Sequence, residues 1–150
     1  VEAALAAAGI ETRALEMPSE TRTAAQAAAA AGCEIDQIAK SIILKGTDSG
    51  EIYLFVTAGG RMVSMDKAAA LTGERLERAE ATAVRAVTGF AIGGVAPVGH
   101  LSHLRCYVDR RLCDFTTVWA AAGTPRHVFP IESRDLLRIL KVQPADFTQD

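Results

Sequence analysis

The segment from Gly89 to His100 is rich in glycine and almost free of side chains that could do chemistry. Gly93 and Gly94 can take backbone conformations closed to other residues and let a substrate approach the main chain. Pro97 fixes the exit of the loop. Its free amide N–H groups could bind a carbonyl oxygen or an oxyanion. A tight turn between strands, without any ligand, is the alternative.

Lys40 lies within the apolar run from Ile38 to Leu44, where the period-two alternation of a strand places it beside buried neighbours. One interpretation is a lysine on an edge strand that extends to solvent and guards the edge. The other is a cation directed into a cleft, where it would meet an anionic group of a substrate.

Other motifs in the sequence give weaker evidence of function. Thr47-Asp48-Ser49-Gly50 lacks the spacing of a serine-hydrolase nucleophile, and His100 and His103 have no third ligand at metal-site spacing. The chain also lacks the glycine patterns of nucleotide-binding loops. We therefore expect neither a metal nor a cofactor.

Composition predicts one globular domain spanning residues 1–150. The chain is 49% hydrophobic and 23% charged, with a net charge of -2. No stretch approaches the roughly 18 continuous apolar residues of a membrane span, and the start, with Glu2 and no basic lead-in, is unlike a signal peptide. Cys33, Cys106 and Cys113 form no C-x-x-C pair and are expected to be reduced, mostly buried thiols. We expect a cytoplasmic protein without a membrane partner.

The charge balance also limits nucleic-acid binding. Sixteen basic residues in a slightly acidic chain cannot neutralise a long stretch of phosphates, so any contact should be local. A local basic patch in the last third of the chain has five candidate members: Arg105, Arg110, Arg111, Arg126 and His127. A solvated charged face is the alternative.

Helical composition and capping residues alternate with β-branched runs along the chain. We expect helices at residues 1–8, 24–31, 64–71, 82–89 and 133–141. Thr21 or Thr23, Ser64 and Thr82 are the expected N-caps of the middle three. We expect strands at residues 11–16, 38–44, 52–56 and 105–109, and note further apolar stretches at residues 117–121 and 127–131. The second and third strands should form a hairpin. Because the spacing is not that of βαβ units, an α+β domain with a mixed sheet is predicted.

Four segments together resemble one family. They are Lys40-Ser41-Ile42-Ile43-Leu44, the glycine loop from Gly89 to Gly99, Asp109, and Val118 to Pro125. In order and spacing these resemble the YbaK/prolyl-tRNA synthetase editing-domain family, over about residues 3–141. The resemblance implies a partly open, β-barrel-like mixed sheet flanked by helices. It also implies a trans-editing aminoacyl-tRNA deacylase that hydrolyses the ester of a wrongly charged tRNA.

The resemblance also assigns roles to residues. Lys40 takes the place of the lysine that orients the 3′-terminal adenosine of the tRNA. The loop from Gly93 to Pro97 would bind the aminoacyl carbonyl or amine and stabilise the oxyanion, with Gly94, Val95 and Ala96 as the pocket wall. Further substrate-binding candidates are Ser41, His100, Asp109, Met17, Thr21 and Thr23. Asp109 would either contact substrate or brace the sheet.

The expected reaction needs no catalytic triad. An activated ester needs only a placed water, donors for the oxyanion and a way to move one proton. The family resemblance implies that the ribose 2′-hydroxyl of the substrate itself provides this proton path. Ala121-Ala122-Gly123 replaces the serine and two glycines of relatives that remove cysteine, and Ser41 replaces the asparagine of a strict alanine-removing branch. We therefore expect proline tRNA carrying alanine or 2-aminobutyrate as substrate, with cysteine and serine or threonine esters as alternatives.

The expected partners are the acceptor end of this tRNA and, as a candidate, prolyl-tRNA synthetase; DNA is not expected. Two other functional classes remain. One is a non-catalytic module that recognises the tRNA acceptor end or a synthetase. The other is a small-molecule binder that uses the glycine loop for a carboxylate.

Overall fold

The computed structural model describes residues 1–7, 9, 14–17, 23–90, 94–101, 104–124 and 127–149. The helices are α1 (Glu2–Ala7), α2 (Ala24–Ala31), α3 (Met65–Thr72), α4 (Ala81–Thr88) and α5 (Ser133–Leu140), with 3₁₀ turns η1 (Ile35–Gln37) and η2 (Arg110–Asp114). The strands are β1 (Leu15–Glu16), β2 (Ile38–Gly46), β3 (Ile52–Ala58), β4 (Leu76–Arg78), β5 (Arg105–Asp109), β6 (Thr117–Ala121), β7 (His127–Glu132) and β8 (Pro144–Ala145).

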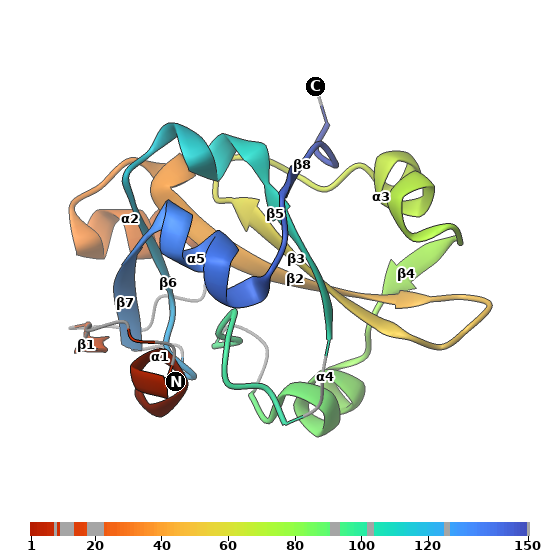
Figure 1. Ribbon diagram of the computed structural model, residues 1–150, viewed down its shortest axis with the longest axis horizontal. Coiled ribbons are helices and arrows are strands. Elements are labelled where there is room, and N and C mark those ends of the chain that lie inside the picture. The colour runs from red at the N-terminus through yellow and green to blue at the C-terminus, as the bar shows by residue number, and fades with distance from the viewer. Residues whose placement is uncertain are drawn as a thin grey trace.

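The strands of the described residues form one mixed, eight-stranded sheet in the order β1-β7-β6-β2-β3-β5-β8, with β4 paired to β2 (Figure 1). Pairs β2–β3 and β6–β7 are antiparallel, whereas β2–β6 and β3–β5 are parallel. The sheet does not close, because its outer strands, β1 and β8, do not pair with each other. The predicted mixed α+β architecture is confirmed.

The long strand β2 has two different neighbours along one edge. Its register with β6 covers Ile38 and Ala39, and its register with β4 covers Leu44 to Gly46. Between these two stretches, at residues 40–42, that edge pairs with no strand of the described chain. The opposite edge is fully paired with β3 from Ala39 to Lys45. The sheet therefore has an interruption beside the segment that contains Lys40.

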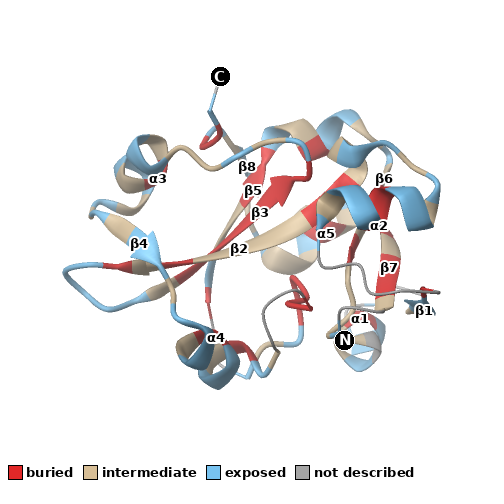
Figure 2. Ribbon diagram, turned by 180° about the vertical axis from the view of Figure 1, so that it is seen from behind, coloured by how far each residue is buried: buried red, intermediate tan, exposed pale blue. Residues whose placement is uncertain are grey.

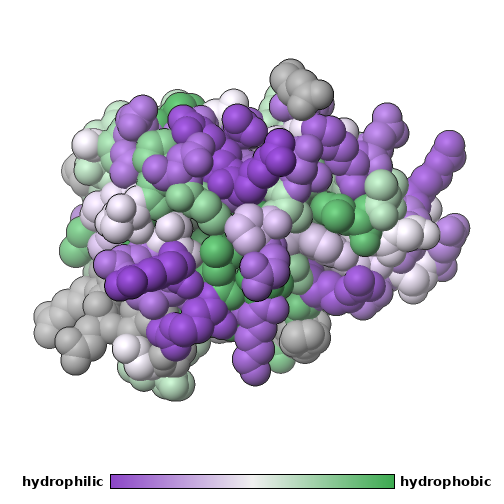
Figure 3. All heavy atoms as spheres, turned by 45° about the horizontal axis from the view of Figure 1, so that its top comes forward, coloured by the Kyte–Doolittle hydropathy of each residue, from purple (hydrophilic) through white to green (hydrophobic). Residues whose placement is uncertain are grey.

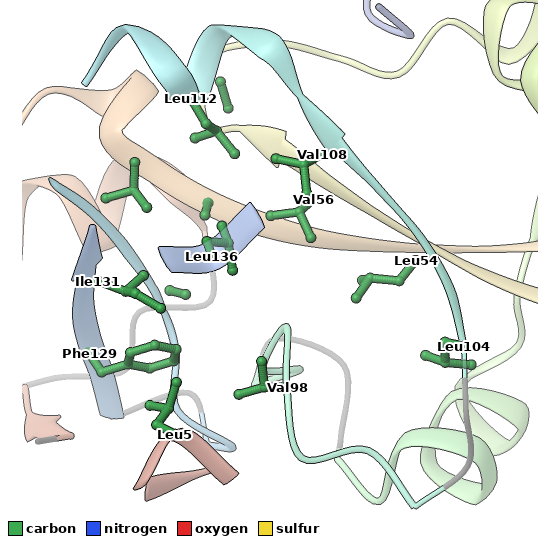
Figure 4. Close-up of a cluster of buried hydrophobic side chains, with 14 residues drawn as sticks. Leu5, Leu54, Val56, Val98, Leu104, Val108, Leu112, Phe129, Ile131 and Leu136 are labelled. Atoms are coloured by element: carbon green, nitrogen blue, oxygen red, sulfur yellow. The ribbon is translucent and has the colours of Figure 1, made fainter. Parts of the chain in front are cut away.

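Helices cover both faces of the sheet. Helix α5 lies across the face seen in Figure 1, with α1 near the end of β7, and the reverse view shows α2 and α3 on the other side (Figures 1 and 2). The main core lies under α5, where Leu136 packs with Leu5 of α1 and Phe129 of β7 (Figure 4). Smaller clusters form where Ala68 of α3 and Ala27 of α2 meet the sheet.

The ends of helices α2 and α3 follow the capping residues predicted from the sequence. Thr23 caps α2, since its side chain accepts a hydrogen bond from the Gln26 amide, and Gly32 ends the helix in the left-handed conformation at φ 71°. Ser64 caps α3 as predicted. The prediction of Thr82 as a cap is wrong, because α4 begins at Ala81 and the N-cap position belongs to Glu80.

The cysteine prediction holds only in part. All three thiols are free, and Cys33 and Cys106 are half-buried, but Cys113 is exposed. Cys113 lies in the 3₁₀ turn η2, whose buried contact with the core is made by Leu112 instead. Across the described residues, no helix is long and apolar enough to span a membrane.

Candidate functional site

A cavity of about 600 Å³ lies where β2 separates from β6, beside α2. Figure 3 shows one face of the molecule, where hydrophobic side chains reach the surface between hydrophilic ones. The described lining is mostly small and apolar: Thr23, Ala24, Ala25, Ala27, Ile35, Ile38, Ala39, Lys40, Ser41, Ile42, Gly59, Arg78, Val95, Trp119, Ala120, Ala121 and Val128. Its charged members are both cations, Lys40 and Arg78. Such a lining suits a ligand that combines an apolar part with negative charge.

Lys40 is half-buried on β2, and two backbone carbonyl groups hold its ammonium in place. Its ammonium donates hydrogen bonds to the carbonyl oxygens of Gly59, at 3.3 Å, and of Arg61. An ammonium has three N–H donors, so one remains for a ligand. The β6 side of β2 is open at Lys40, so this residue does lie at a local edge of the sheet. Its side chain lines the cavity at that edge, which fits the interpretation of a cation directed into a cleft.

Two carboxylates support the charge of Lys40. Burial lowers the pKa of its ammonium, and the negative charges of Asp36 and then Asp109 act in the opposite direction. Asp109 is 1% exposed, and its oxygens accept hydrogen bonds from the amides of Ala58 and Arg111 at 3.1 and 3.0 Å. Asp109 thus braces the ends of β3 and β5 and is absent from the described cavity lining.

Ser41 presents an unsatisfied hydroxyl at the cavity. Its Oγ atom is buried and has no hydrogen-bond partner within the described part of the chain. A buried hydroxyl without a partner costs free energy, on the order of 1–3 kcal/mol, and is an exception that needs a reason. Because Ser41 lines the cavity, a bound ligand can supply the missing partner.

The glycine loop contributes to the cavity through Val95. Gly94, Val95, Ala96 and Pro97 are all buried, but of these only Val95 belongs to the described lining. Gly93 lies outside the described residues. A Cβ added to Gly94 would come within 2.8 Å of the Thr124 backbone, so this glycine permits a close approach of two segments.

His100 holds the same loop from its far end. Its Nε2 atom lies 2.6 Å from the carbonyl oxygen of Ala96, and its ring meets Phe90 edge to face at 6.1 Å. Burial lowers the pKa of the imidazole, whereas the hydrogen bond to Ala96 opposes this shift. His100 does not line the described part of the cavity.

Of the substrate-binding candidates in the N-terminal part of the chain, the structure places one at the cavity. Thr23 is exposed, caps α2 and lines the cavity. Met17 is 7% exposed and does not belong to the described lining. Thr21 lies outside the described residues.

The basic patch predicted for the last third is largely neutralised. Arg105 pairs with Glu51, Arg110 with Asp146, and Arg111 with both Asp36 and Asp114. Arg126 lies outside the described residues. These paired arginines fit the alternative, a solvated charged face.

Several residues that line the cavity were not predicted from the sequence. The alanines of α2 were assigned only as helix formers, and Arg78 was not considered, since Leu76-Glu77-Arg78 carries no strand pattern. Gly59 is required because a Cβ there would overlap the carbonyl oxygen of Ile35. These residues reach the site only through tertiary packing, which local patterns do not encode.

Comparison with known proteins places this geometry in a family. A chain of the same fold, described as a "putative trans-editing enzyme for prolyl tRNA synthetase", shares 41% identity at a TM-score of 0.92, covering 99% of this chain and 94% of that one. The hypothetical protein APE2540 shares 29% identity at a TM-score of 0.91, covering 99% and 98%. The uncharacterized protein YwhH of Bacillus subtilis (strain 168) is 29% identical over 121 residues, which cover 81% of this chain and 76% of YwhH. The model of the aminoacyl-tRNA editing domain matches residues 18–139, and the chain therefore belongs to the aminoacyl-tRNA editing domain family.

Proposed function

We propose that the protein hydrolyses the ester of proline tRNA that carries a small aliphatic amino acid, alanine or 2-aminobutyrate, and that it does so in the cytoplasm. Family membership and the likeness to a chain described as acting for prolyl tRNA synthetase support an editing deacylase. The observation that carries the proposal is the cavity beside Lys40, in which the unsatisfied Ser41 hydroxyl meets a wall of small apolar side chains.

The proposed pocket selects by size. Ala120 and Ala121 of β6, the α2 alanines and Val95 leave room for a short aliphatic side chain without offering it a hydrogen bond. An apolar pocket discriminates by about 1–3 kcal/mol for each methylene, which explains why a second sieve is useful after a synthetase has made its choice. Alanine and 2-aminobutyrate differ by one such group.

In the proposed reaction, Lys40 positions the substrate. Its remaining N–H donor faces the terminal adenosine, while the carbonyl oxygens of Gly59 and Arg61 hold the ammonium in place. Asp109 acts on Lys40 through charge and is a positioning residue. The Ser41 hydroxyl hydrogen-bonds to the bound aminoacyl-adenosine.

Water attacks the ester carbonyl, and the resulting oxyanion accepts hydrogen bonds from backbone amides of the loop from Gly93 to Pro97. The C–O bond to the ribose then breaks, and the proton released by the attacking water passes through the neighbouring 2′-hydroxyl to the leaving oxygen. The products are the free amino acid and uncharged tRNA. No side chain of the protein needs to act as a nucleophile.

The test is deacylation of proline tRNA charged in parallel with alanine, 2-aminobutyrate, cysteine, serine and proline. We expect selective loss of the alanine and 2-aminobutyrate esters. Lys40→Ala should slow this loss by about 100-fold or more, because misplaced reacting groups lose that much rate. Lys45→Ala is the matched control, since Lys45 lies on the same strand and is absent from the described lining.

Two results would count against the proposal. If all five esters stay intact, the protein is not a deacylase for this tRNA. If Lys40→Ala and Lys45→Ala behave alike, Lys40 does not position the substrate. Preferential loss of the cysteine or serine ester would leave an editing enzyme with a different substrate.

A further inference from the structure

Arg78 is a second cation at the cavity, and nothing in the described chain neutralises it. It lies on β4 and is exposed, and its side chain has no ion-pair or hydrogen-bond partner among the described residues. The arginines of η2, by contrast, are all paired with aspartates. No Asp or Glu belongs to the described lining, although the whole chain carries a net charge of -2. The described lining of the cavity thus carries positive charge only, although Asp36 and Asp109 lie close enough to act on Lys40.

The sheet places Arg78 on the same face as Lys40. Arg78 is directly opposite Leu44 in the antiparallel β2–β4 pair, so their side chains share one face. Side chains alternate along a strand, so Lys40 and Ile42 lie on that face as well. Lys40 precedes Leu44 by four residues, which corresponds to roughly 13 Å along β2. The two cations therefore lie at opposite ends of one apolar trough, with Ile42 between them.

A guanidinium is suited to one kind of partner in this position. It stays charged at all relevant pH values and offers paired N–H donors that match a phosphate group. Contacts to backbone phosphates position a nucleic acid without reading its sequence. A tRNA whose terminal adenosine lies at Lys40 and whose chain leaves the cavity past Ile42 would bring such a phosphate to β4.

We propose that Arg78 binds a backbone phosphate near the 3′ end of the tRNA whose terminal adenosine lies at Lys40; this inference rests on the proposed function. Arg78 fixes the direction in which the nucleic acid leaves the cavity. The contact is to the RNA backbone, so it contributes to affinity for any tRNA with a free 3′ end.

The experiment compares Arg78→Gln with Arg85→Gln, which removes an equal charge from an exposed position on α4 outside the described lining. For alanyl-tRNA, we expect Arg78→Gln to raise KM about tenfold or more, as for the loss of a charge-assisted hydrogen bond, and to leave kcat unchanged. The slope of log(kcat/KM) against log[salt] should become shallower by about 0.7, the value for one single-strand phosphate. Arg85→Gln should match the wild type in both measures.

Binding of uncharged proline tRNA, followed by fluorescence anisotropy, gives a readout that does not depend on turnover. Arg78→Gln should weaken this binding by the same factor as it raises KM. If the wild type binds tRNA but hydrolyses no ester, the proposed function fails while the Arg78 comparison still decides the phosphate contact. Equal affinity of the Arg78→Gln and Arg85→Gln variants would overturn the proposal, as would a fall in kcat at constant KM.

Discussion

Gly94 lies directly against the backbone of Thr124, so closely that a single added Cβ would come within 2.8 Å of the Thr124 Cα and carbonyl carbon. This contact joins the glycine loop to the turn that follows β6. Gly94→Ala should therefore displace the loop and lower the deacylation rate of every ester substrate by about 10- to 100-fold. Single-turnover rates would measure it.

The control for this variant is Gly73→Ala. Gly73 ends α3 at φ 84°, and a Cβ added there would have nothing within 4 Å, so the substitution strains the backbone away from the cavity. It should lower the free energy of unfolding by about 1 kcal/mol and leave the deacylation rate unchanged. A Gly94→Ala enzyme as active as Gly73→Ala would show that the contact with Thr124 does not position the loop.

Val95 and Ala96 should respond differently to enlargement. Val95 lines the cavity, so Val95→Leu should reduce hydrolysis of the 2-aminobutyrate ester more than that of the alanine ester, by about tenfold. Ala96 is fully buried outside the described lining, so Ala96→Val should overpack the loop, cost about 1–3 kcal/mol of stability, and slow both esters alike. Parallel rates for the two esters, beside urea unfolding curves, test this; equal loss on both esters in Val95→Leu would remove Val95 from the pocket wall.

The pH dependence of activity should report the charge of Lys40. Because Asp109 raises the pKa of Lys40, Asp109→Asn should lower that pKa further. Activity falls as Lys40 loses its proton, so the alkaline limb of the kcat/KM profile should move to lower pH. Asp36→Asn should move it in the same direction, since Asp36 acts on Lys40 in the same way. An unmoved limb in both variants would mean that Lys40 charge does not control the reaction.

His100 should make the protein sensitive to mild acid. Its pKa is lowered by burial in the folded state, so protonation below the ordinary value of about 6.5 favours the unfolded chain. The contribution of a neutral His100 is present above that value and is lost as pH falls through the lowered pKa. His100→Gln keeps a donor for Ala96 and should flatten the decline in stability between pH 7 and pH 5. Chemical denaturation at each pH gives the comparison, and an identical decline in both proteins would rule out His100 as its origin.

The elements that could be predicted are those specified by neighbouring residues. Helix α2 follows from Thr23, the alanines and Gly32, and the β2–β3 hairpin follows from two β-branched runs around a turn. Strand β4 could not be predicted, because its three residues become a strand only by pairing with the open edge of β2.

The residues of the candidate site also fall into those that have a local sequence signal and those that do not. Lys40 was recognisable as a charged residue in an apolar strand, and the glycine loop by its composition. Arg78 and the alanines that line the cavity have no local mark, and they meet Lys40 because the order of strands brings α2, β4 and β6 to the same stretch of β2. Position in the sheet, not residue type, makes them part of the site.

The interruption along β2 has a consequence for amide hydrogen exchange. Ile43 accepts a hydrogen bond from the Ala79 amide on the β4 side, so the amide and carbonyl of Ser41, two residues earlier, point to that same edge. There, no described strand pairs with them. The Ser41 amide should thus exchange with deuterium much faster than the amides of the neighbouring strand positions that are paired with β3, although all belong to the same strand. Slowing of that single amide by a bound aminoacyl-adenosine would identify the central strand itself as part of the binding surface.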